Sequence, residues 1–149
     1  MLIRPMEAGD VDSVHRIECE SFSMPWSRQG FLDALKMEQN IMLVAEEDGI
    51  VYGYACTYVS FDEGELTNIA VDKSMRGNGI GQQIIKEIQQ ISSQTGVDRI
   101  VLEARVSNHA AIGLYKKMGF AELGIRKNFY EQPVEDAMIL SYTAEAKEC

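Results

Sequence analysis

The chain of 149 residues is long enough for one domain with its own core, which we place at residues 1–149, and too short for two full-sized domains. Apolar residues make up 46% and charged residues 25%, as in ordinary globular proteins, and no apolar run approaches the roughly 20 residues of a membrane span. The net charge of −9 disfavours nucleic-acid binding, which requires a basic surface, and either attracts a cationic partner or serves solubility alone.

The cysteines and histidines favour a reducing compartment without a metal site. Cys19, Cys56 and Cys149 are far apart and form no Cys-x-x-Cys pair, which is typical of free thiols in the cytosol. The N-terminal segment "MLIRPMEAGD" lacks the basic and apolar regions of a secretory signal, so we expect a cytoplasmic protein. His15 and His109 do not lie at ligand spacing from a cysteine, and we expect no metal.

The first third of the chain predicts a strand, two helices and the first strands of a meander. "MLIR" is typical of a short strand, and an apolar stripe of helical spacing begins after the possible cap at residues 7–10. Pro25 interrupts that helix, and Ser27 can cap a second one. "IMLVAEE" and "IVYGYACTYVS" then flank Asp48 and Gly49, a pair that strongly predicts a hairpin.

The middle of the chain predicts a third antiparallel strand followed by a long helix. We expect a turn at Asp62–Gly64, a strand at Leu66–Val71 and a loop after it. Isoleucines recur at helical spacing from Ile80 to Ile91, and Gly96 lies where a glycine commonly ends a helix.

The last third predicts a strand, a helix and two closing strands. "DRIVLEARV" is strand-like, and Ser107 or Asn108 can cap a helix whose last turn carries Lys116 and Lys117 at the negative end of the dipole. "FAELGIRKN" and "DAMILSYT" form strands around Pro133. The order β-α-α-β-β-β-α-β-α-β-β contains one crossover, which should be parallel and right-handed, and predicts a mixed, mostly antiparallel α/β sheet.

A cluster of glycines lies at the start of the long helix. The segment "MRGNGIGQQ" contains Gly77, Gly79 and Gly81, with Lys73 and Arg76 as local positive charges. A helix start offers unpaired N–H groups and the positive end of the dipole, and glycines let a backbone approach an anion closely. We therefore expect this segment to bind a phosphate, most simply a pyrophosphate.

Three other interpretations of the glycines compete. They can form a merely flexible turn, although three glycines directly before a regular helix are more than a turn needs. A dinucleotide site of the Gly-x-Gly-x-x-Gly type would find an acid at Glu103, but Gln82 or Ile84 occupies the position of its third glycine. A P-loop is excluded because no Gly-Lys-Ser/Thr is present.

The glycine segment also carries a family resemblance. Arg76-x-x-Gly79-x-Gly81 is similar to the acetyl-CoA motif R/Q-x-x-G-x-G/A of the GCN5-related N-acetyltransferase (GNAT) superfamily. With "TNIAVD", "LEARVSNHAAIGLYKKMGF" and "RKNFYE", nearly the whole chain resembles the bacterial ribosomal-protein alanine N-acetyltransferases. The resemblance implies the GNAT fold, acetyl-CoA as donor, and the N-terminal amine of a basic small-subunit ribosomal protein as acceptor.

The resemblance also implies which residues contact the donor. The strand before the glycines holds the pantetheine arm, the amides of the loop hold the pyrophosphate, and one asparagine further on contacts the cofactor. The implied cofactor-binding set is Ile69, Ala70, Val71, Arg76, Gly77, Asn78, Gly79, Ile80, Gly81 and Asn108.

Acetyl transfer needs a neutral amine, a polarised thioester carbonyl and a proton for the departing thiolate. A protein α-amine has a pKa of about 7.7–8.0, against about 10.4 for lysine, so a modest base suffices. The resemblance makes Glu103, at the end of "RIVLE", that base, directly or through a water, and makes Tyr115 the acid. From the residues alone, Tyr115 is equally a core aromatic. A backbone N–H of the Ile69–Val71 strand is a candidate to polarise the thioester oxygen.

The acceptor side is less well marked. We expect Tyr130, in a turn at Asn128–Tyr130, to line the peptide entrance; Phe129 stands where the family often carries a second tyrosine, so no hydroxyl acts there. A small amine, an antibiotic or a lysine side chain is an alternative acceptor. A catalytically silent acyl-CoA-binding module and a nicotinamide-dinucleotide protein are the alternatives of other classes.

Overall fold

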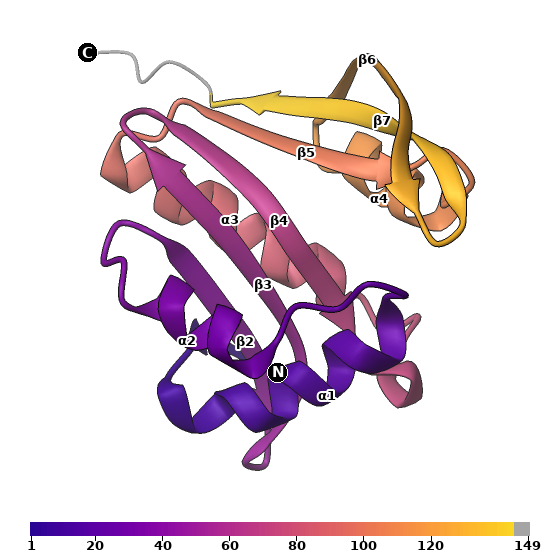
Figure 1. Ribbon diagram of the computed structural model, residues 1–149. Helices are drawn as coiled ribbons and strands as arrows, with labels where there is room; N and C mark the ends of the chain where they lie inside the picture. The colour runs from indigo at the N-terminus through magenta and orange to yellow at the C-terminus, as the bar shows by residue number, and fades with distance from the viewer. Residues whose placement is uncertain (145–149) are drawn as a thin grey trace.

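The computed structural model describes residues 1–144, so Cys149 lies outside the described residues (Figure 1). The strands of this part of the chain are β1 (Leu2–Pro5), β2 (Ile41–Glu47), β3 (Ile50–Ser60), β4 (Glu63–Val71), β5 (Arg99–Arg105), β6 (Ala121–Glu131) and β7 (Val134–Thr143). Its α-helices are α1 (Val11–Ser21), α2 (Arg28–Leu35), α3 (Ile80–Thr95) and α4 (His109–Lys117). The order of these strands and helices is the predicted one, and two short 3₁₀ turns, Ala8–Asp10 and Lys73–Met75, lie between them.

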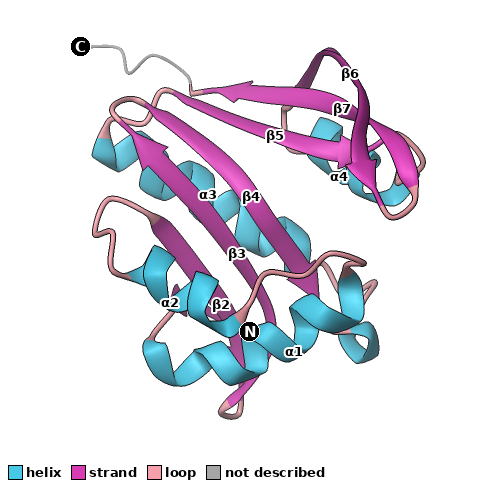
Figure 2. Ribbon diagram, viewed as in Figure 1, coloured by secondary structure: helices cyan, strands magenta, loops and turns pink. Residues whose placement is uncertain are grey.

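All seven strands form one sheet in the order β1-β2-β3-β4-β5-β7-β6 (Figure 2). β4 and β5, which are joined by the crossover through α3, pair in parallel, whereas every other neighbouring pair is antiparallel. The predicted mixed, mostly antiparallel sheet with one parallel crossover is confirmed. The described residues therefore form a single α/β domain.

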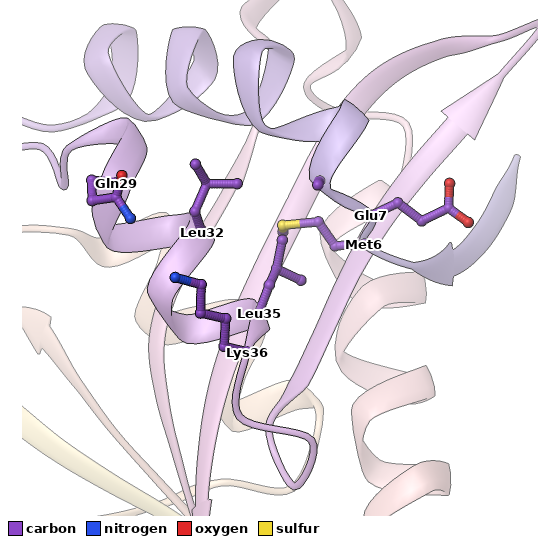
Figure 3. A pocket seen from close by; sticks show the side chains of 7 residues that line it. Met6, Glu7, Gln29, Leu32, Leu35 and Lys36 are labelled. Atoms are coloured by element: carbon purple, nitrogen blue, oxygen red, sulfur yellow. The ribbon is translucent and has the colours of Figure 1, made fainter.

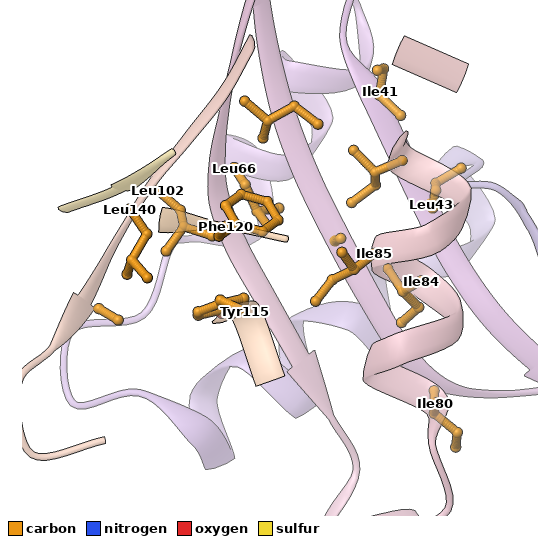
Figure 4. Close-up of a cluster of buried hydrophobic side chains, with 14 of the residues drawn as sticks. Ile41, Leu43, Leu66, Ile80, Ile84, Ile85, Leu102, Tyr115, Phe120 and Leu140 are labelled. Carbon is orange, nitrogen blue, oxygen red and sulfur yellow. The ribbon is translucent and has the colours of Figure 1, made fainter. Parts of the chain in front are cut away.

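Helices cover both faces of the sheet, and each face has its own core. α1 and α2 lie on one face and α3 and α4 on the other (Figure 1). The α3–α4 face buries isoleucines of α3 against leucines of the central strands, together with Tyr115 and Phe120 (Figure 4). The isoleucine spacing that predicted α3 thus marks the side of the helix that faces this core.

The predicted helix ends are confirmed by their hydrogen bonds. Ser27 Oγ accepts from Gly30 N at 3.0 Å, and Asn108 Oδ1 accepts from Ala111 N at 3.3 Å, so each side chain satisfies a free amide at a helix start. Gly96 ends α3 with a φ of 81°, a left-handed conformation that glycine adopts without strain.

The turn expected at Asp62–Gly64 lies earlier in the chain. Phe61 and Asp62 form the reversal, with a φ of 57° at Phe61, and β4 already begins at Glu63. Gly64 is a strand residue because it packs closely: a Cβ there would lie 3.2 Å from Thr57 Cγ2. The glycine was therefore a signal of close packing and was misinterpreted as a turn residue.

The turn expected at Asn128–Tyr130 is wrong as well. These residues lie within β6, where the register with β7 shifts between Arg126 and Tyr130 and Asn128 takes a φ of 54°. Asn128 N donates to Asp136 Oδ1 at 2.9 Å, which anchors this irregularity on β7. The reversal itself lies at residues 132–133, so Tyr130 sits on a bulged strand and not in a loop.

The sheet divides between β4 and β5. Their pairing runs from Glu63 opposite Arg99 to Leu66 opposite Leu102 and stops there, although both strands continue. β4 stays paired with β3 and β5 stays paired with β7, so beyond Leu66 the two halves of the sheet separate (Figure 1). We use the word cleft for this separation of the two strands, which is defined by the end of their pairing and is flanked by the carboxyl ends of β4 and β5.

A bulge in β4 lies at the point where the cleft begins. Cys56 of β3 pairs with Asn68 and Thr57 pairs with Leu66, so Thr67 is an extra residue in β4. Its Oγ1 donates to the Cys56 carbonyl at 3.1 Å. Because a bulge bends its strand, this extra residue directs β4 away from β5.

Candidate active site

The glycine loop between β4 and α3 has the conformation that an anion site requires. Gly77 and Gly79 have φ values of 82° and 76°, and Gly79 is the N-cap of α3. A Cβ at either position would meet nothing within 4 Å, so their backbone conformation, and not crowding, explains the glycines. The first amides of α3 have no acceptor within the helix and remain available to a ligand.

Gly81 has a different role from the other two glycines. It lies inside α3, and a Cβ there would come within 3.2 Å of Leu114 Cδ2 on α4. The missing side chain therefore allows α3 and α4 to approach each other. Two of the three glycines shape the loop, and the third sets the distance between helices.

Side chains of the loop fix its own backbone. Arg76 Nε donates to the Val71 carbonyl at 3.1 Å, and Asn78 Nδ2 donates to the Met75 carbonyl at 2.9 Å. Lys73 is exposed beside them. The positive charge predicted at Arg76 is thus tethered to the last residue of β4, at the edge of the cleft.

Asp72 fastens the start of the loop and was not recognised in the sequence. Its Oδ1 accepts from Ser74 N at 2.9 Å and Ser74 Oγ at 2.7 Å, and its Oδ2 accepts from Arg16 Nη2 on α1 at 2.9 Å. The Ser74 backbone bond first, then the Ser74 hydroxyl and Arg16, lower the pKa of Asp72 to about 2.

The edge of β4 in the cleft offers unpaired backbone groups. Asp72 N donates to the Tyr52 carbonyl of β3 at 2.7 Å. Ala70, which precedes Asp72 by two residues, pairs with Tyr54 of β3. Because backbone groups alternate in direction along a strand, those of Ile69 and Val71 point away from β3. Of the three predicted strand residues, Ile69 therefore presents its N–H and C=O to the cleft and Val71 presents its N–H, because the Val71 carbonyl accepts from Arg76; Ala70 directs its own groups to β3.

The opposite wall carries Glu103, the first residue of β5 beyond its pairing with β4. Its side chain is 20% exposed, and its Oε1 accepts from Arg126 Nη1 on β6 at 2.7 Å. This ion pair holds one carboxylate oxygen in place on the acceptor side. Arg126 gave no signal in the sequence because 23 residues separate it from Glu103.

Tyr130 links the two predicted catalytic residues electrostatically. Burial first, and then the nearby Glu103 carboxylate, raise the pKa of Tyr130 to about 12, with Arg105 opposing them. Tyr115 is 7% exposed; burial and, second, Tyr130 raise its pKa above the ordinary value. These two pKa shifts indicate that Tyr130 lies within electrostatic range of both Glu103 and Tyr115.

Glu103 and Tyr115 reach this neighbourhood from opposite faces of the sheet. Tyr115 belongs to the core of the α3–α4 face, with its ring centroid 5.9 Å from that of Phe120 (Figure 4). Glu103 lines a hollow of about 580 Å³ on the other face. This hollow also carries the carboxylates of Asp62, Glu63 and Glu65, which make it strongly acidic.

Arg105 supports Tyr130 from β5. Its guanidinium carbon lies 4.4 Å from the centroid of the Tyr130 ring, and its Nη1 donates to Pro133 O at 2.9 Å and to Glu135 Oε1 at 3.3 Å. Glu135 Oε2 in turn accepts from Ser107 N at 2.7 Å, just before α4. The β6–β7 turn is thereby fixed to the start of α4.

Another hollow, of about 690 Å³, lies between α2 and the segment after β1 (Figure 3). Its walls are mainly apolar and contain none of the predicted site residues; they are Met6, Glu7, Ala8, Gln29, Leu32, Leu35 and Lys36. Across residues 1–144 no helix is long and apolar enough to cross a membrane. In the same residues no three potential metal ligands come together.

The fold and the cleft define a class of protein. Residues 11–120 match the acetyltransferase (GNAT) family, so the chain belongs to this family. It is accordingly an acetyl-CoA-dependent N-acetyltransferase, as the Arg76-x-x-Gly79-x-Gly81 motif and the order of strands predicted.

The relatives are more specific than the family. The Bacillus subtilis relative, provisionally described as a [ribosomal protein bS18]-alanine N-acetyltransferase, is 38% identical over 95% of this chain and 94% of its own. The Escherichia coli K12 [ribosomal protein bS18]-alanine N-acetyltransferase is 33% identical over 93% of this chain and 95% of its own. A crystal structure of the ribosomal-protein-S18-alanine N-acetyltransferase from Escherichia coli superposes with a TM-score of 0.91, at 32% identity, over 99% of this chain and 96% of that one.

Proposed function

We propose that this N-acetyltransferase modifies the N-terminal α-amine of a ribosomal protein, namely the alanine of bS18, the substrate named for its relatives. One observation supports this most directly: Glu103, with its carboxylate bonded by Arg126, follows the last β4–β5 pair and so lies across the cleft from the edge of β4 that leads into the glycine loop. The same substrate leads us to propose a cytoplasmic location, where ribosomal proteins are made.

The chain fits acetyl-CoA as its acetyl donor. The amides of Gly77–Gly81 and the first turn of α3 suit a pyrophosphate, with Arg76 beside them. The N–H and C=O of Ile69 and the N–H of Val71 suit the amides of the pantetheine arm, and we propose that an N–H of this strand polarises the thioester oxygen. Asn108 uses its Oδ1 to cap α4, which leaves its Nδ2 as a donor toward the cofactor. The donor supplies the activated acetyl group, and these residues bind and orient it.

Glu103 acts as the general base of the transfer. Arg126 occupies its Oε1, so Oε2 is the oxygen that receives a proton from the acceptor ammonium, directly or through one water. The proton to be removed has a pKa of about 7.7–8.0 for an α-amine and about 10.4 for a lysine. A carboxylate therefore deprotonates an N-terminal amine at far lower cost than a lysine side chain.

Tyr115 acts as the proton donor to the departing thiolate. Its raised pKa keeps the phenol protonated throughout the physiological range, so the proton is always present. A raised pKa also makes full transfer to a thiol of pKa near 8.5 less favourable. We therefore propose that Tyr115 works as a hydrogen-bond donor that completes proton transfer only as the carbon–sulfur bond breaks.

The acidic hollow provides the attraction for the acceptor. Glu103 shares the hollow with Asp62, Glu63 and Glu65, and no lysine or arginine is among its lining residues. A local negative field attracts the protonated N-terminus and basic residues that follow it. Tyr130, whose ring contacts the Arg105 guanidinium, is the residue that we propose lines the entrance for the peptide.

A panel of acceptors tests the proposal. A peptide with the N-terminal sequence of bS18 from the same organism should be acetylated once, at its α-amine, as judged by tandem mass spectrometry. The same peptide blocked at its N-terminus, free small amines and internal lysines should remain unmodified. Preferential acetylation of lysines or small amines would refute the N-terminal assignment. Acetyl-CoA binding without transfer to any of these would favour a silent acyl-CoA-binding module.

A further inference from the structure

A buried carboxylate lies beneath the active site and takes no part in the chemistry described above. Glu18 of α1 is 1% exposed. Its Oε1 accepts from the Tyr54 hydroxyl on β3, its Oε2 accepts from Trp26 N at 2.9 Å, and Asn68 Nδ2 on β4 lies 3.1 Å from both oxygens. One side chain thus joins α1, β3, β4 and the segment between α1 and α2.

Stability alone does not account for this arrangement. A buried charge costs several kcal/mol of desolvation, and well-packed apolar residues commonly replace such a group without loss of stability. All three partners of Glu18 are donors, so the site is built for an acceptor with two oxygens. Burial and the Glu18 charge raise the pKa of Tyr54, which keeps its hydroxyl protonated as one of these donors.

Through Asn68, Glu18 supports the β4 wall of the cleft, which is the wall that we propose binds acetyl-CoA; we call it the donor wall. Asn68 follows the bulged residue Thr67 and precedes Ile69, the first residue whose backbone groups point into the cleft. Its side-chain amide is held by both oxygens of Glu18. The orientation of β4 beyond the bulge is therefore fixed through this contact.

Through Trp26, Glu18 also supports the acidic hollow, which is where we propose that the acceptor peptide binds. The Trp26 backbone is bound to Glu18, and the Trp26 ring lies 5.8 Å from the Tyr58 ring and 5.3 Å from the Phe31 ring. Tyr58 lines the acidic hollow that contains Glu103. Displacement of Trp26 would consequently move a wall of this hollow.

We propose that Glu18 is a positioning residue for acetyl transfer: it fixes the bulged part of β4 and the Trp26 segment relative to each other, so that donor and acceptor meet in register. Glu18 touches neither substrate and acts through Asn68 and Trp26. This inference rests on the proposed function, because it concerns the alignment of an acceptor peptide with the thioester.

The substitution Glu18→Gln tests it with almost no change of volume. Glutamine keeps one acceptor oxygen and places an NH₂ group opposite partners that are themselves donors. We expect kcat/KM for the N-terminal peptide to fall at least about tenfold, which corresponds to 1.4 kcal/mol. The backbone amide of Trp26 should also exchange hydrogen faster, a measurement that does not depend on turnover.

A control separates positioning from a general loss of stability. Val97 is buried in the α3–α4 core beside Gly64, at the end of the sheet where β4 and β5 are still paired. Val97→Ala creates a cavity there and lowers Tm without touching the Glu18 contacts. Even where its Tm is lowered as much as that of Glu18→Gln, Val97→Ala should leave the peptide KM unchanged.

A second substitution provides rescue. In Glu18→Gln with Asn68→Asp, the glutamine oxygen accepts from Trp26 N, and its NH₂ group donates to the new carboxylate and to the Tyr54 hydroxyl oxygen. All hydrogen bonds are restored with the charge moved to residue 68, so kcat/KM should recover by at least half of the logarithmic loss.

The outcomes decide between the two proposals. If the wild-type protein does not acetylate the peptide, the proposed function fails. If the wild-type protein does acetylate it, and Glu18→Gln has the same kcat/KM and the same hydrogen exchange at Trp26, only the positioning role fails. A kcat/KM loss in Val97→Ala equal to that in Glu18→Gln also overturns positioning. Should Glu18→Gln not fold, Tyr54→Phe removes a single donor and is held to the same outcomes, with a smaller expected loss of about threefold.

Discussion

The two walls of the cleft are built by different means. The donor wall uses backbone groups of the β4 edge and of the glycine loop, all within about a dozen consecutive residues that are fixed by local bonds such as Arg76 to Val71. The acceptor wall uses side chains held by partners far away in the chain, such as Glu103 with Arg126 and Arg105 with Glu135. In the proposed site, donor recognition would therefore be local in the sequence, whereas acceptor recognition would depend on the assembled sheet.

The largest expected effect is at Glu103. Glu103→Gln should lower kcat by about 10²–10⁴-fold, the usual contribution of a general base, because the amide cannot accept the acceptor proton. The acetyl-CoA Kd, measured by calorimetry, should stay within about twofold because the donor wall is untouched. Unchanged turnover between pH 6 and 9 would remove Glu103 from the role of base.

A change in the glycine loop should weaken acetyl-CoA binding and leave the peptide KM unchanged. Gly79→Ala forces a left-handed conformation on a residue with a Cβ, at a cost of about 1–2 kcal/mol. We expect the acetyl-CoA Kd to rise about tenfold at an unchanged peptide KM. Gly9 is the matched control, because its Cβ would also meet open space and its φ is not positive. Equal donor binding by Gly79→Ala and Gly9→Ala would contradict the role given to the loop.

A change in the acceptor wall should spare the donor. Arg105→Leu removes the cation over the Tyr130 ring and the bonds to the β6–β7 turn. We expect the KM of the peptide to rise about fivefold, which corresponds to loss of about 1 kcal/mol of positioning energy. Steady-state kinetics with each substrate varied in turn checks this prediction. A rise in the acetyl-CoA KM instead would show that the two walls are not separable.

The smallest effect concerns acid stability at the start of the loop. The pKa of Asp72 is about 2 in the folded protein against 3.8 for an unperturbed group, so its ionisation stabilises the fold above pH 3.8, and this contribution is lost as the pH falls from 3.8 through 2. After screening by solvent we expect about 1 kcal/mol. Asp72→Asn keeps a capping oxygen, so urea unfolding should show this difference from wild type at pH 6 and almost none at pH 2. A difference that persists at pH 2 would exclude the charge as its cause.

Local features of the fold were predictable from the sequence. The cap at Ser27, the C-terminal glycine of α3 and the parallel crossover follow from short-range rules, and each is confirmed. The two misplaced turns have a common reason. Gly64 and Asn128 resemble turn residues, but the first is required by packing against Thr57 and the second by a bulge anchored on Asp136.

The candidate site was predictable only in part. Glu103 and Tyr115 came from a family resemblance, and their roles stay predictions. Arg126 gave no signal, because an ion pair between residues 23 positions apart leaves no periodic pattern. The bonds of Glu18 to Tyr54 and Asn68, 36 and 50 positions away, leave none either. The salient cue for Glu18 was a charged residue on the apolar stripe of α1, a position where a carboxylate is buried only when it is fully bonded.

The short ladder between β4 and β5 also has a mechanical consequence. In the part of the chain that the structure describes, β4 and β5 pair only from Glu63 to Leu66, whereas the neighbouring pairs of strands are bonded along most of their length. Under a force that pulls β3 and β7 apart, we expect the backbone hydrogen bonds between β4 and β5 to break first. Acetyl-CoA bound between the two strands would connect them beyond Leu66, where their described backbone pairing has ended, so we expect the liganded protein to unfold at higher force.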